Sequence, residues 1–273
     1  MNVRQKEKSR THHARLSREE IENIRMQAKA GASLRQISTR LHLPSTTVYY
    51  HAKKFCRKMT SLELDVLSEK EQGYLIGMFV GDGAHIIRAN QGHYITKFSL
   101  AKGRDENIAE YMQGLFAKAG KRIGWCIERN SITLRVFSKE FLQFMVKYVT
   151  RIEQVGTHRK KKLLIDHGGW SKALKSGFIS GLIDSDGYVY FDPVRGRRFG
   201  VLIRTADCDL RDQIISVLKS LNSASTTYVG KYHEKSYSIR PQFVIYVPTK
   251  ELDKLSELLI AVKLRRQRFP FTQ

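Results

Sequence analysis

The sequence predicts an α+β protein in which a small all-helical domain precedes a duplicated unit with the element order αββαββα. Two observations predict the duplication. The segments YLIGMFVGDGAHI at 74–86 and FISGLIDSDGYVY at 178–190 are both apolar helical runs that end in Asp-Gly, and Asp82 and Asp186 lie 104 residues apart. The same order of strand-like and helix-like stretches then follows each segment. Three short amphipathic runs before residue 60 predict the helical domain.

Composition limits the class of protein. The 273 residues include 48 Lys and Arg against 26 Asp and Glu, a formal net charge of +22, and 41% of the residues are hydrophobic. The chain can bury a core, so it is not wholly disordered, and its charge excludes an ordinary neutral metabolic enzyme as the default. Cys56, Cys126 and Cys208 match no metal-ligand spacing, which argues against a zinc ribbon and a disulfide framework.

The expected location is intracellular, in the cytoplasm or nucleoid. No apolar run approaches the roughly 18 residues needed to cross a bilayer, and the basic opening stretch lacks the apolar segment of a secretion signal. A surplus of positive charge on such a chain favours a nucleic acid over a membrane as the partner.

The first 58 residues predict a basic arm and a helical domain. Residues 1–16 are polar and unpatterned, which predicts a mobile arm, and residues 17–58 predict three helices, the first opened by a capping box between Ser17 and Glu20. The run GASLRQISTRLHLPSTTVYYHAKK resembles the helix-turn-helix of resolvase-like DNA-binding modules. The resemblance implies that the last helix enters the major groove and presents Thr46, Thr47, Tyr50, His51, Lys53 and Lys54. The alternative is a helical bundle that only packs on its neighbour.

Residues 59–72 are interpreted as a linker, 73–172 as the first repeat and 173–273 as the second repeat. In the first repeat we expect strands and helices, in the order strand, strand, helix, strand, strand, helix, at 84–89, 93–101, 105–119, 121–128, 131–137 and 138–149. In the second repeat the same order is expected at 188–192, 198–205, 208–221, 226–232, 237–247 and 249–260.

The two motif helices are predicted to lie against each other. Gly77 and Gly81 are four residues apart, as are Gly181 and Ser185, so each helix has a stripe without bulky side chains. Each motif ends in a glycine, Gly83 or Gly187, which we expect in the left-handed conformation that ends a helix.

Asp82 and Asp186 would then meet at two helix carboxyl ends, where the helix dipole disfavours negative charge. Divalent cations between the carboxylates would make the arrangement favourable, and hard oxygen ligands select Mg²⁺ or a similar ion such as Mn²⁺. Metal held beside DNA indicates phosphodiester hydrolysis.

The two motifs resemble those of the LAGLIDADG homing endonucleases in their single-chain form, over about residues 73–268. The resemblance implies two four-stranded antiparallel sheets that form a DNA-binding saddle. It also implies a monomeric, site-specific, divalent-metal-dependent endonuclease that cuts both strands of double-stranded DNA, as in intron homing. The metal role carries over to Asp82 and Asp186 only. One departure is that the second motif has an earlier acid, Asp184, where the first has Val80; we expect Asp184 to make structural hydrogen bonds.

The same resemblance implies basic residues near the reacting phosphate. Lys102 matches a position late in the second strand, and its counterpart in the second repeat is Arg204 or Thr205. Lys161 and Lys263, from two basic runs at the 104-residue offset, match a later lysine, with Arg159, Lys160 and Arg265 as competitors.

Basic residues on the predicted strands are candidates for contacts with DNA bases and phosphates, although a solvated face would look the same in the sequence. The candidates are Arg135, Arg198, Lys231 and Arg240.

Two alternative functions remain open. One is a non-cleaving DNA-binding regulator on the same scaffold, suggested by the added helical domain and by Val80. The other is an intron RNA maturase, since members of the family that the chain resembles can assist the folding of structured intron RNA.

Overall fold

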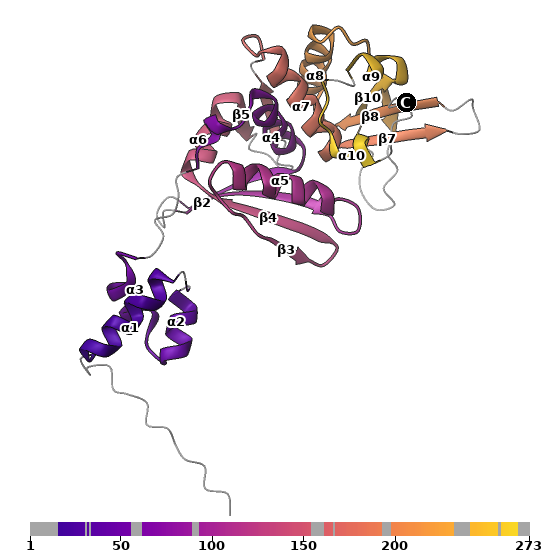
Figure 1. Ribbon diagram of the computed structural model, residues 1–273. Coiled ribbons are helices and arrows are strands. Elements are labelled where there is room, and N and C mark those ends of the chain that lie inside the picture. Colours follow the sequence, from indigo (N-terminus) through magenta and orange to yellow (C-terminus); the bar gives the residue numbers. More distant parts are fainter. Residues whose placement is uncertain are drawn as a thin grey trace, which may run out of the picture. The chain divides into compact units, whose positions relative to one another are not determined.

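The computed structural model describes residues 16–30, 32, 34–55, 62–88, 93–153, 161–165, 167–192, 198–231, 241–255 and 258–266 (Figure 1). Internal contacts divide the chain into two compact units, Met1–Thr60 and Ser61–Gln273. Residues 1–15 of the predicted arm lie outside the described residues, as do Arg159, Lys160 and Arg240. The backbone of Lys161, Arg198, Lys231 and Arg265 is described, and their side chains are not.

The first unit contains the three predicted helices, α1 (Arg18–Lys29), α2 (Leu34–Leu41) and α3 (Ser45–Ala52). The capping box that opens α1 is present, because Ser17 Oγ accepts from the Glu20 amide at 3.1 Å while a Glu20 carboxylate oxygen accepts from the Ser17 amide at 2.8 Å. The helices enclose a small core of fully or nearly fully buried side chains: Ile24, Ala28, Ile37, Leu43, Val48 and Ala52.

The second unit has the predicted α+β architecture with two repeats. In the first repeat, α4 (Glu69–Asp82) is followed by β1 (Gly83–Arg88), β2 (His93–Ala101), α5 (Glu106–Lys118), β3 (Trp125–Glu128), β4 (Ser131–Phe137) and α6 (Lys139–Tyr148). In the second repeat, α7 (Lys172–Ser185) is followed by β7 (Gly187–Asp192), β8 (Arg198–Thr205), α8 (Cys208–Ser220), β9 (Thr226–Lys231), β10 (Pro241–Pro248) and α9 (Thr249–Leu255).

Each repeat forms a four-stranded antiparallel sheet, in the orders β1-β2-β4-β3 and β7-β8-β10-β9. The registers correspond, since Gly83 pairs with Phe98 in the first sheet and Gly187 pairs with Ile203 in the second. Alternate residues of the central strands, such as Phe98 and Ile203, point into one common core beneath the helices. The two four-stranded antiparallel sheets that the resemblance implies are confirmed.

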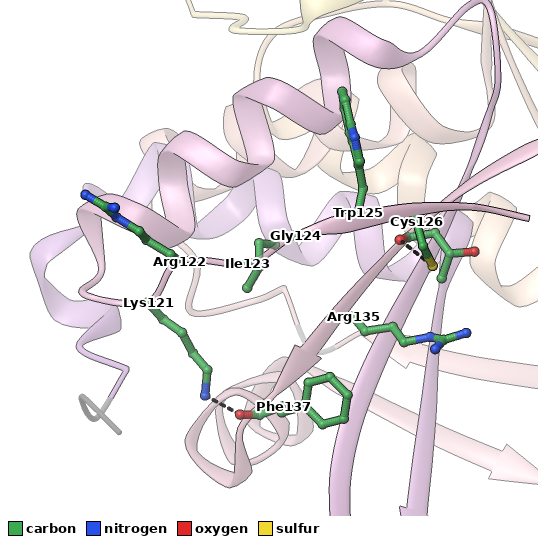
Figure 2. Close-up of a pocket in the computed structure, with 9 residues that line it drawn as sticks. Lys121, Arg122, Ile123, Gly124, Trp125, Cys126, Arg135 and Phe137 are labelled. Atoms are coloured by element: carbon green, nitrogen blue, oxygen red, sulfur yellow. Dashed lines mark hydrogen bonds between the residues drawn. The ribbon is translucent and has the colours of Figure 1, made fainter. Parts of the chain in front are cut away.

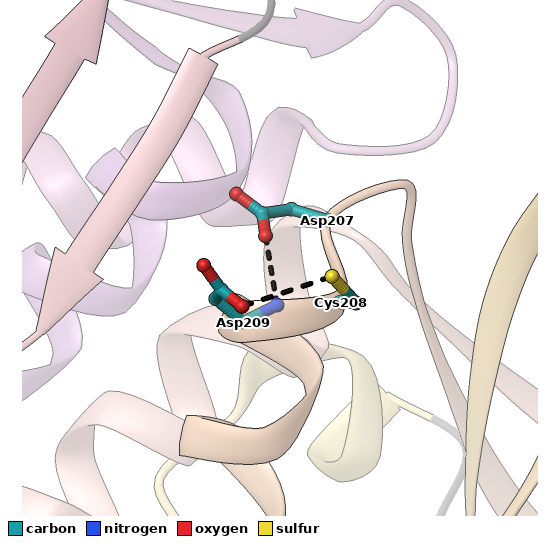
Figure 3. Close-up of side chains that lie close together, drawn as sticks. All are labelled: Asp207, Cys208 and Asp209. Carbon is teal, nitrogen blue, oxygen red and sulfur yellow. Dashed lines mark hydrogen bonds between the residues drawn. The ribbon is translucent and has the colours of Figure 1, made fainter.

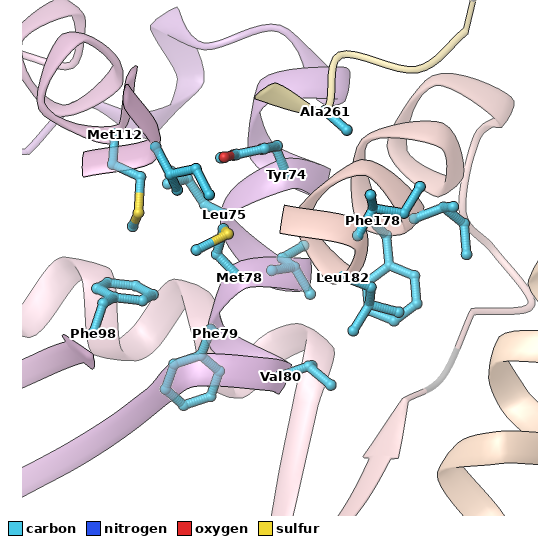
Figure 4. Close-up of a cluster of buried hydrophobic side chains, with 14 of the residues drawn as sticks. Tyr74, Leu75, Met78, Phe79, Val80, Phe98, Met112, Phe178, Leu182 and Ala261 are labelled. Carbon is cyan, nitrogen blue, oxygen red and sulfur yellow. The ribbon is translucent and has the colours of Figure 1, made fainter. Parts of the chain in front are cut away.

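The seam between the repeats is formed by α4 and α7, which cross with their backbones in contact. A Cβ added to Gly77 would lie 2.2 Å from the Phe178 carbonyl oxygen, and one added to Gly181 would lie 2.2 Å from the Tyr74 carbonyl oxygen. Any side chain at these positions would therefore push the helices apart. The predicted stripe is longer than expected, because Gly73 and Gly177 continue it by one turn on each helix. Apolar side chains of both helices pack on either side of the seam (Figure 4).

Each repeat ends in a segment that packs on the other repeat. After α6, β5 (Val149–Glu153) and β6 (Lys161–Ile165) form a two-stranded hairpin, and the Ile165 amide donates to Gln213 Oε1 on α8 at 3.0 Å. After α9, the short helix α10 (Val262–Arg266) packs on α5 and α7. The repeats are thus interlocked at both ends as well as along the seam.

Several expectations differ from the structure. Gly83 is extended (φ −87°, ψ 148°) rather than left-handed, and Gly187 has no positive φ either. Glycine is needed at both positions for space, because an added Cβ would lie 2.4 Å from the Phe79 carbonyl oxygen or 2.4 Å from the Ile183 carbonyl oxygen. The helix expected at 249–260 ends at Leu255, and the strand expected from residue 121 begins only at Trp125.

The segment interpreted as a linker contributes to the second unit. Leu62, Leu64 and Leu67 are buried in the core of that unit, with a 3₁₀ turn at Leu64–Val66. Ser68 then opens α4 with a capping box to Glu71.

Across the described residues, no helix is long and apolar enough to cross a membrane.

Candidate functional site

The two motif aspartates come together where α4 and α7 end. Asp82 is the last residue of α4, and Asp186 directly follows α7, with its amide donating to the Leu182 carbonyl oxygen at 3.0 Å. A Cβ added to Gly81 would lie 3.0 Å from an Asp186 carboxylate oxygen, so this carboxylate reaches across the seam to the residue beside Asp82. The small residues Gly81 and Ser185 are what permit this approach. The predicted meeting of the two acids is therefore present.

The electrostatics of the site disfavour two bare carboxylates. The pKa of Asp82 is raised to about 7, chiefly by burial and then by the negative charges of Asp186 and Asp105, while the charge of Lys263 opposes the rise. Because the raised pKa means that the ionised carboxylate is unfavourable here, a bound proton or cation stabilises this group. The donor set consists of hard carboxylate oxygens, which fit Mg²⁺ or Mn²⁺.

Hydrogen bonds to backbone carbonyl oxygens hold the Lys263 side chain next to this pair. Its ammonium donates to the carbonyl oxygens of Ser185 at 3.2 Å and Gly187 at 3.0 Å, on either side of Asp186. These carbonyls lie at the end of α7, where a positive charge is favourable. Among the predicted basic residues whose side chains are described, Lys263 is the one whose charge acts on Asp82.

The two basic runs that the sequence aligns occupy different structures. Lys161 begins the strand β6, whereas Lys263 is the second residue of the helix α10. The two lysines are 102 residues apart, so at the 104-residue offset Lys161 corresponds to Arg265 and Lys263 to Arg159. Lys161 and Lys263 therefore lie on elements with different backbone geometry.

Lys102 is exposed and follows β2, where its amide donates to the Asn130 carbonyl oxygen at 3.1 Å. The strand register does not reach its counterpart in the second repeat, because β8 ends at Thr205, which corresponds to Leu100. Counted back from the helix N-caps Asp105 and Asp207, Lys102 corresponds to Arg204.

Asp207 has a structural role at the start of α8. One of its carboxylate oxygens accepts from the amides of Asp209 at 2.9 Å and Leu210 at 3.3 Å, which caps the helix. Cys208 and Asp209 lie beside it, with the ligand atoms of all three residues within 4.8 Å of one another (Figure 3). Asp105 occupies the same N-cap position at the start of α5.

Asp184 makes the structural hydrogen bonds expected of it. It is fully buried and accepts from Tyr74 Oη at 2.8 Å, from the Val262 amide at 2.6 Å and from the Lys263 amide at 2.8 Å. Burial raises its pKa to about 6, while these three hydrogen bonds oppose the rise. Sequence reasoning did not identify Tyr74 as a partner, because Tyr74 belongs to the other motif helix.

On the outer face of the first sheet, Arg135 is held by an acid. Arg135 and Lys97 both form ion pairs with Glu128, the latter at 3.4 Å, and Thr133 donates to the same carboxylate at 3.2 Å. Next to this cluster is a pocket of about 290 Å³ lined in part by Trp125, Cys126 and Phe137, where the Lys121 ammonium donates to the Phe137 carbonyl oxygen (Figure 2). This face is thus partly self-neutralised.

The outer face of the second sheet is aromatic in the part that the structure describes. Tyr188 and Tyr228 are more than half exposed. The ring of Tyr246 covers Gly200 on the neighbouring strand, since a Cβ on that glycine would lie 2.5 Å from it. The two sheets therefore offer different chemistry to a partner.

The residues predicted for the recognition helix lie on α3 or directly after it. Val48 and Ala52 face the core, while Tyr50, Lys53 and Lys54 are exposed. The Lys53 ammonium lies 5.0 Å from the centre of the Tyr50 ring, which stacks edge-on with His51 at 5.1 Å. Thr46 is exposed as well, whereas Thr47 and His51 are partly buried.

Comparisons with known proteins concern the second unit. Residues 173–266 match the LAGLIDADG-like domain family. No curated protein matches the chain. Among solved structures, I-DmoI in complex with DNA and Mn is 16% identical, with a TM-score of 0.48, over 71% of this chain and 97% of that one.

Two further structures are similar at the same level. The homing endonuclease I-WcaI bound to its DNA recognition sequence is 16% identical, with a TM-score of 0.47, over 77% of this chain and 86% of that one. The N-terminal LAGLIDADG domain of DUF199/WhiA is 17% identical, with a TM-score of 0.45, over 77% and 97%. Residues 173–266 thus match a LAGLIDADG-like domain, and the repeat that precedes them has the same order of helices and strands and the same four-stranded sheet.

Proposed function

We propose that the protein is a monomeric, site-specific, divalent-metal-dependent endonuclease that hydrolyses both strands of double-stranded DNA. One observation carries the proposal: Asp82 and Asp186 are brought together at the ends of two interlocked helices, in a chain whose formal net charge is +22. Two like charges at helix carboxyl ends are unfavourable unless a cation binds there, and a strongly basic protein attracts a phosphate backbone.

Asp82 and Asp186 would hold Mg²⁺ or Mn²⁺ through carboxylate oxygens. When bound, a divalent cation polarises the scissile phosphodiester, lowers the pKa of an attacking water and stabilises the leaving oxygen. For the carboxylates to act as ligands, Asp82 must lose the proton that it retains below a pH of about 7.

The basic residues of the site complement the acids. The Lys263 ammonium, which donates to carbonyl oxygens at the end of α7, adds positive charge where negative charge develops on the phosphate. Lys102 and Lys161 are proposed to approach the same phosphates from the first repeat. Arg135, on the outer face of the first sheet, is proposed to contact the DNA, and so are Arg198, Lys231 and Arg240.

The three-helix unit is proposed to add DNA affinity. Its α3 presents Tyr50, Lys53 and Lys54 to the surface while Val48 holds the helix on its core. A helix of this kind fits the major groove, with lysines for phosphates and Thr46 for a base edge.

The test is cleavage of a library of randomised duplex sites with Mg²⁺, followed by sequencing of the cut ends. We expect the unchanged chain to select a defined site and Asp82→Asn and Asp186→Asn to bind that site without cutting it. Two results together would instead identify a non-cleaving regulator. The unchanged chain would bind DNA without cutting it, and Asp82→Asn would give the same footprint. That candidate is favoured by the added three-helix unit.

An RNA maturase is distinguished in the same experiment by a second substrate. Tighter binding to a structured intron RNA than to duplex DNA at equal salt, and splicing activity unaffected by Asp82→Asn, would replace the endonuclease proposal. Salt must be held constant because phosphate binding depends steeply on it.

A further inference from the structure

The two motif helices differ in the polar residues that they bury. On α7, Ser180 and Asp184 are one turn apart and fully buried. At the 104-residue offset, α4 has Ile76 and Val80 in their place. Buried polar groups are costly unless they are hydrogen-bonded, so the polar pair on α7 requires a structural partner that α4 does not need.

That partner is the segment that leads into α10. The Ile260 amide donates to Ser180 Oγ at 2.9 Å, and the Val262 and Lys263 amides donate to the two oxygens of Asp184 at 2.6 and 2.8 Å. The first turn of a helix leaves its amides without intrahelical acceptors, so a carboxylate there satisfies them and opposes the helix dipole. Asp184 thus determines where α10 begins.

Tyr74 extends this arrangement across the seam. Its hydroxyl, from the first repeat, donates to Asp184 Oδ2 at 2.8 Å, and its ring stacks edge-on with Tyr111 of α5 at 4.9 Å. By the same offset, the mirror pair of Tyr74 and Asp184 is Phe178 and Val80. Both members of the mirror pair are apolar, so the polar pair occurs on one side of the seam only.

The carboxyl-terminal helix in turn positions a charge. Ala261 and Leu264 are buried, at 1% and 7% exposure, so the helix cannot turn about its axis without exposing one of them. Between these two residues, Lys263 extends to the Ser185 and Gly187 carbonyl oxygens on either side of Asp186. The place of the ammonium therefore depends on the place of α10.

We propose that Asp184, together with Tyr74 of the other repeat, is a positioning residue that holds α10 so that the Lys263 ammonium stays beside the pair Asp82 and Asp186. This inference rests on the proposed function, in which that pair is the cleavage site. It makes the site asymmetric, because the first repeat has Val80 at the position of Asp184.

A purely structural role for Asp184 makes a different prediction. If Asp184 only adds stability, its loss lowers the melting temperature, and the effect on cleavage adds to that of losing Lys263. If Asp184 acts through Lys263, the effects of losing Asp184 and of losing Lys263 on the cleavage rate are not additive. The loss of Asp184 has then already displaced the ammonium that the loss of Lys263 removes.

The first experiment is amide hydrogen exchange in the full chain, with Asp184→Asn and Tyr74→Phe. We expect faster exchange over residues 261–266 relative to α9 in both variants. The smaller effect is expected for Tyr74→Phe, which removes one of three hydrogen bonds and keeps the ring. Exchange at α10 that is the same as in the unchanged chain would overturn the proposal.

The second experiment is a double-mutant cycle in the single-turnover rate of DNA cleavage with Mg²⁺. Lys263→Met is expected to slow cleavage by about 10- to 100-fold, Asp184→Asn by a comparable factor, and the double variant by no more than the slower single variant. DNA affinity measured with Ca²⁺ should stay within about 2-fold of the unchanged chain. Fully additive rate effects would contradict the proposal.

A matched control separates positioning from lost stability. Ser138 is also buried and caps a helix, accepting from the Phe141 amide at 3.1 Å, on α6. Ser138→Ala should lower the melting temperature without changing exchange at α10 or the cleavage rate. If the unchanged chain cuts no DNA, the proposed function fails, and the exchange experiment then decides by itself whether Asp184 holds α10.

Discussion

Asp82 is an acid that keeps its proton up to about neutral pH. Burial is the largest cause of its raised pKa, followed by the charge of Asp186. In the unfolded chain the same carboxyl loses its proton near pH 3.8. Between these two values the folded state binds more protons than the unfolded state, so the stability contributed by protonated Asp82 is lost as pH rises through the window. Asp184, with a pKa of about 6, acts in the same direction.

We predict that divalent cations stabilise the protein in a pH-dependent way. At pH 8, where Asp82 is ionised, Mn²⁺ should raise the melting temperature by several degrees, because a ligand that binds only the folded state stabilises it by mass action. At pH 5.5, where Asp82 holds its proton, the shift should disappear. Thermal unfolding with and without Mn²⁺ at both pH values measures this.

The control for this prediction is Asp82→Asn. This variant should be more stable than the unchanged chain at pH 8 without metal, because the like-charge repulsion with Asp186 is removed, and it should lose the Mn²⁺ shift. A Mn²⁺ shift of equal size in the variant would place the cation elsewhere.

The residues of the site could be predicted to different extents. Asp82 and Asp186 were identified from the sequence because duplication preserves their place in the repeat. The pairing of Tyr74 with Asp184 could not be, since it depends on which faces of α4 and α7 meet across the seam. The choice between Arg204 and Thr205 as the counterpart of Lys102 also required the structure, since Arg204 matches when positions are counted from the helix N-caps Asp105 and Asp207.

At the scale of elements, α4 and α7 depend on glycine for their close approach. We predict that Gly77→Ala and Gly181→Ala each destabilise the protein by about 2–4 kcal/mol or prevent folding, because the added methyl would meet backbone atoms that cannot move independently. Denaturant unfolding measures the change in the free energy of unfolding.

Gly114 provides the matched control on α5. A Cβ there meets no atom within 4 Å, and the residue is exposed within the helix. Gly114→Ala should therefore stabilise the protein by about 0.5–1 kcal/mol, since alanine has the higher helix propensity. Destabilisation by Gly114→Ala as large as that by Gly77→Ala would show that close helix contact is not the cause.

The first sheet carries an acid that neutralises part of its basic surface. Glu128 is paired with both Lys97 and Arg135, and these two charges lower its pKa. We predict that Glu128→Gln strengthens binding of non-specific duplex DNA by several-fold at low salt and less at high salt, because two basic side chains are released. Glu140→Gln, the same charge change on α6, should have little effect in the same filter-binding titration.

The sequence predicted the elements well where the hydrophobic period was clear. The strands of both sheets and the helices α5, α6 and α8 lie within a few residues of their expected bounds. The end of α9 was missed because the chain beyond Leu255 turns to meet Ser180, a contact 80 residues away in sequence. The hairpin of β5 and β6 was missed as well, since each of its strands is only five residues long.

At the scale of the whole molecule, the charge predicts strongly salt-dependent binding. Affinity for duplex DNA should fall by about 10³- to 10⁵-fold between 50 and 200 mM salt if 6–10 phosphates are contacted. Replacing Lys53 and Lys54 by Gln should reduce the slope of log K against log salt by about 2, if both contact phosphates.

Lys118→Gln serves as the control for the slope. Lys118 is paired with Glu71 at 2.7 Å, so its charge is already balanced within the protein. A slope reduced as much by Lys118→Gln as by one of the α3 lysines would indicate an effect of net charge alone rather than of contacts made by α3.

The single Tyr74–Asp184 pair has a consequence for how the two halves of this protein could exist apart. If residues 173–266 alone formed a twofold homodimer, each Asp184 would face Phe178, which has no hydroxyl to donate, and two buried carboxylates would each lose a hydrogen bond. Residues 73–172 paired with themselves would set Tyr74 against Val80, leaving a buried hydroxyl unpaired. Neither half is self-complementary any longer, so divergence after the duplication has made the fused chain the form in which both halves are satisfied.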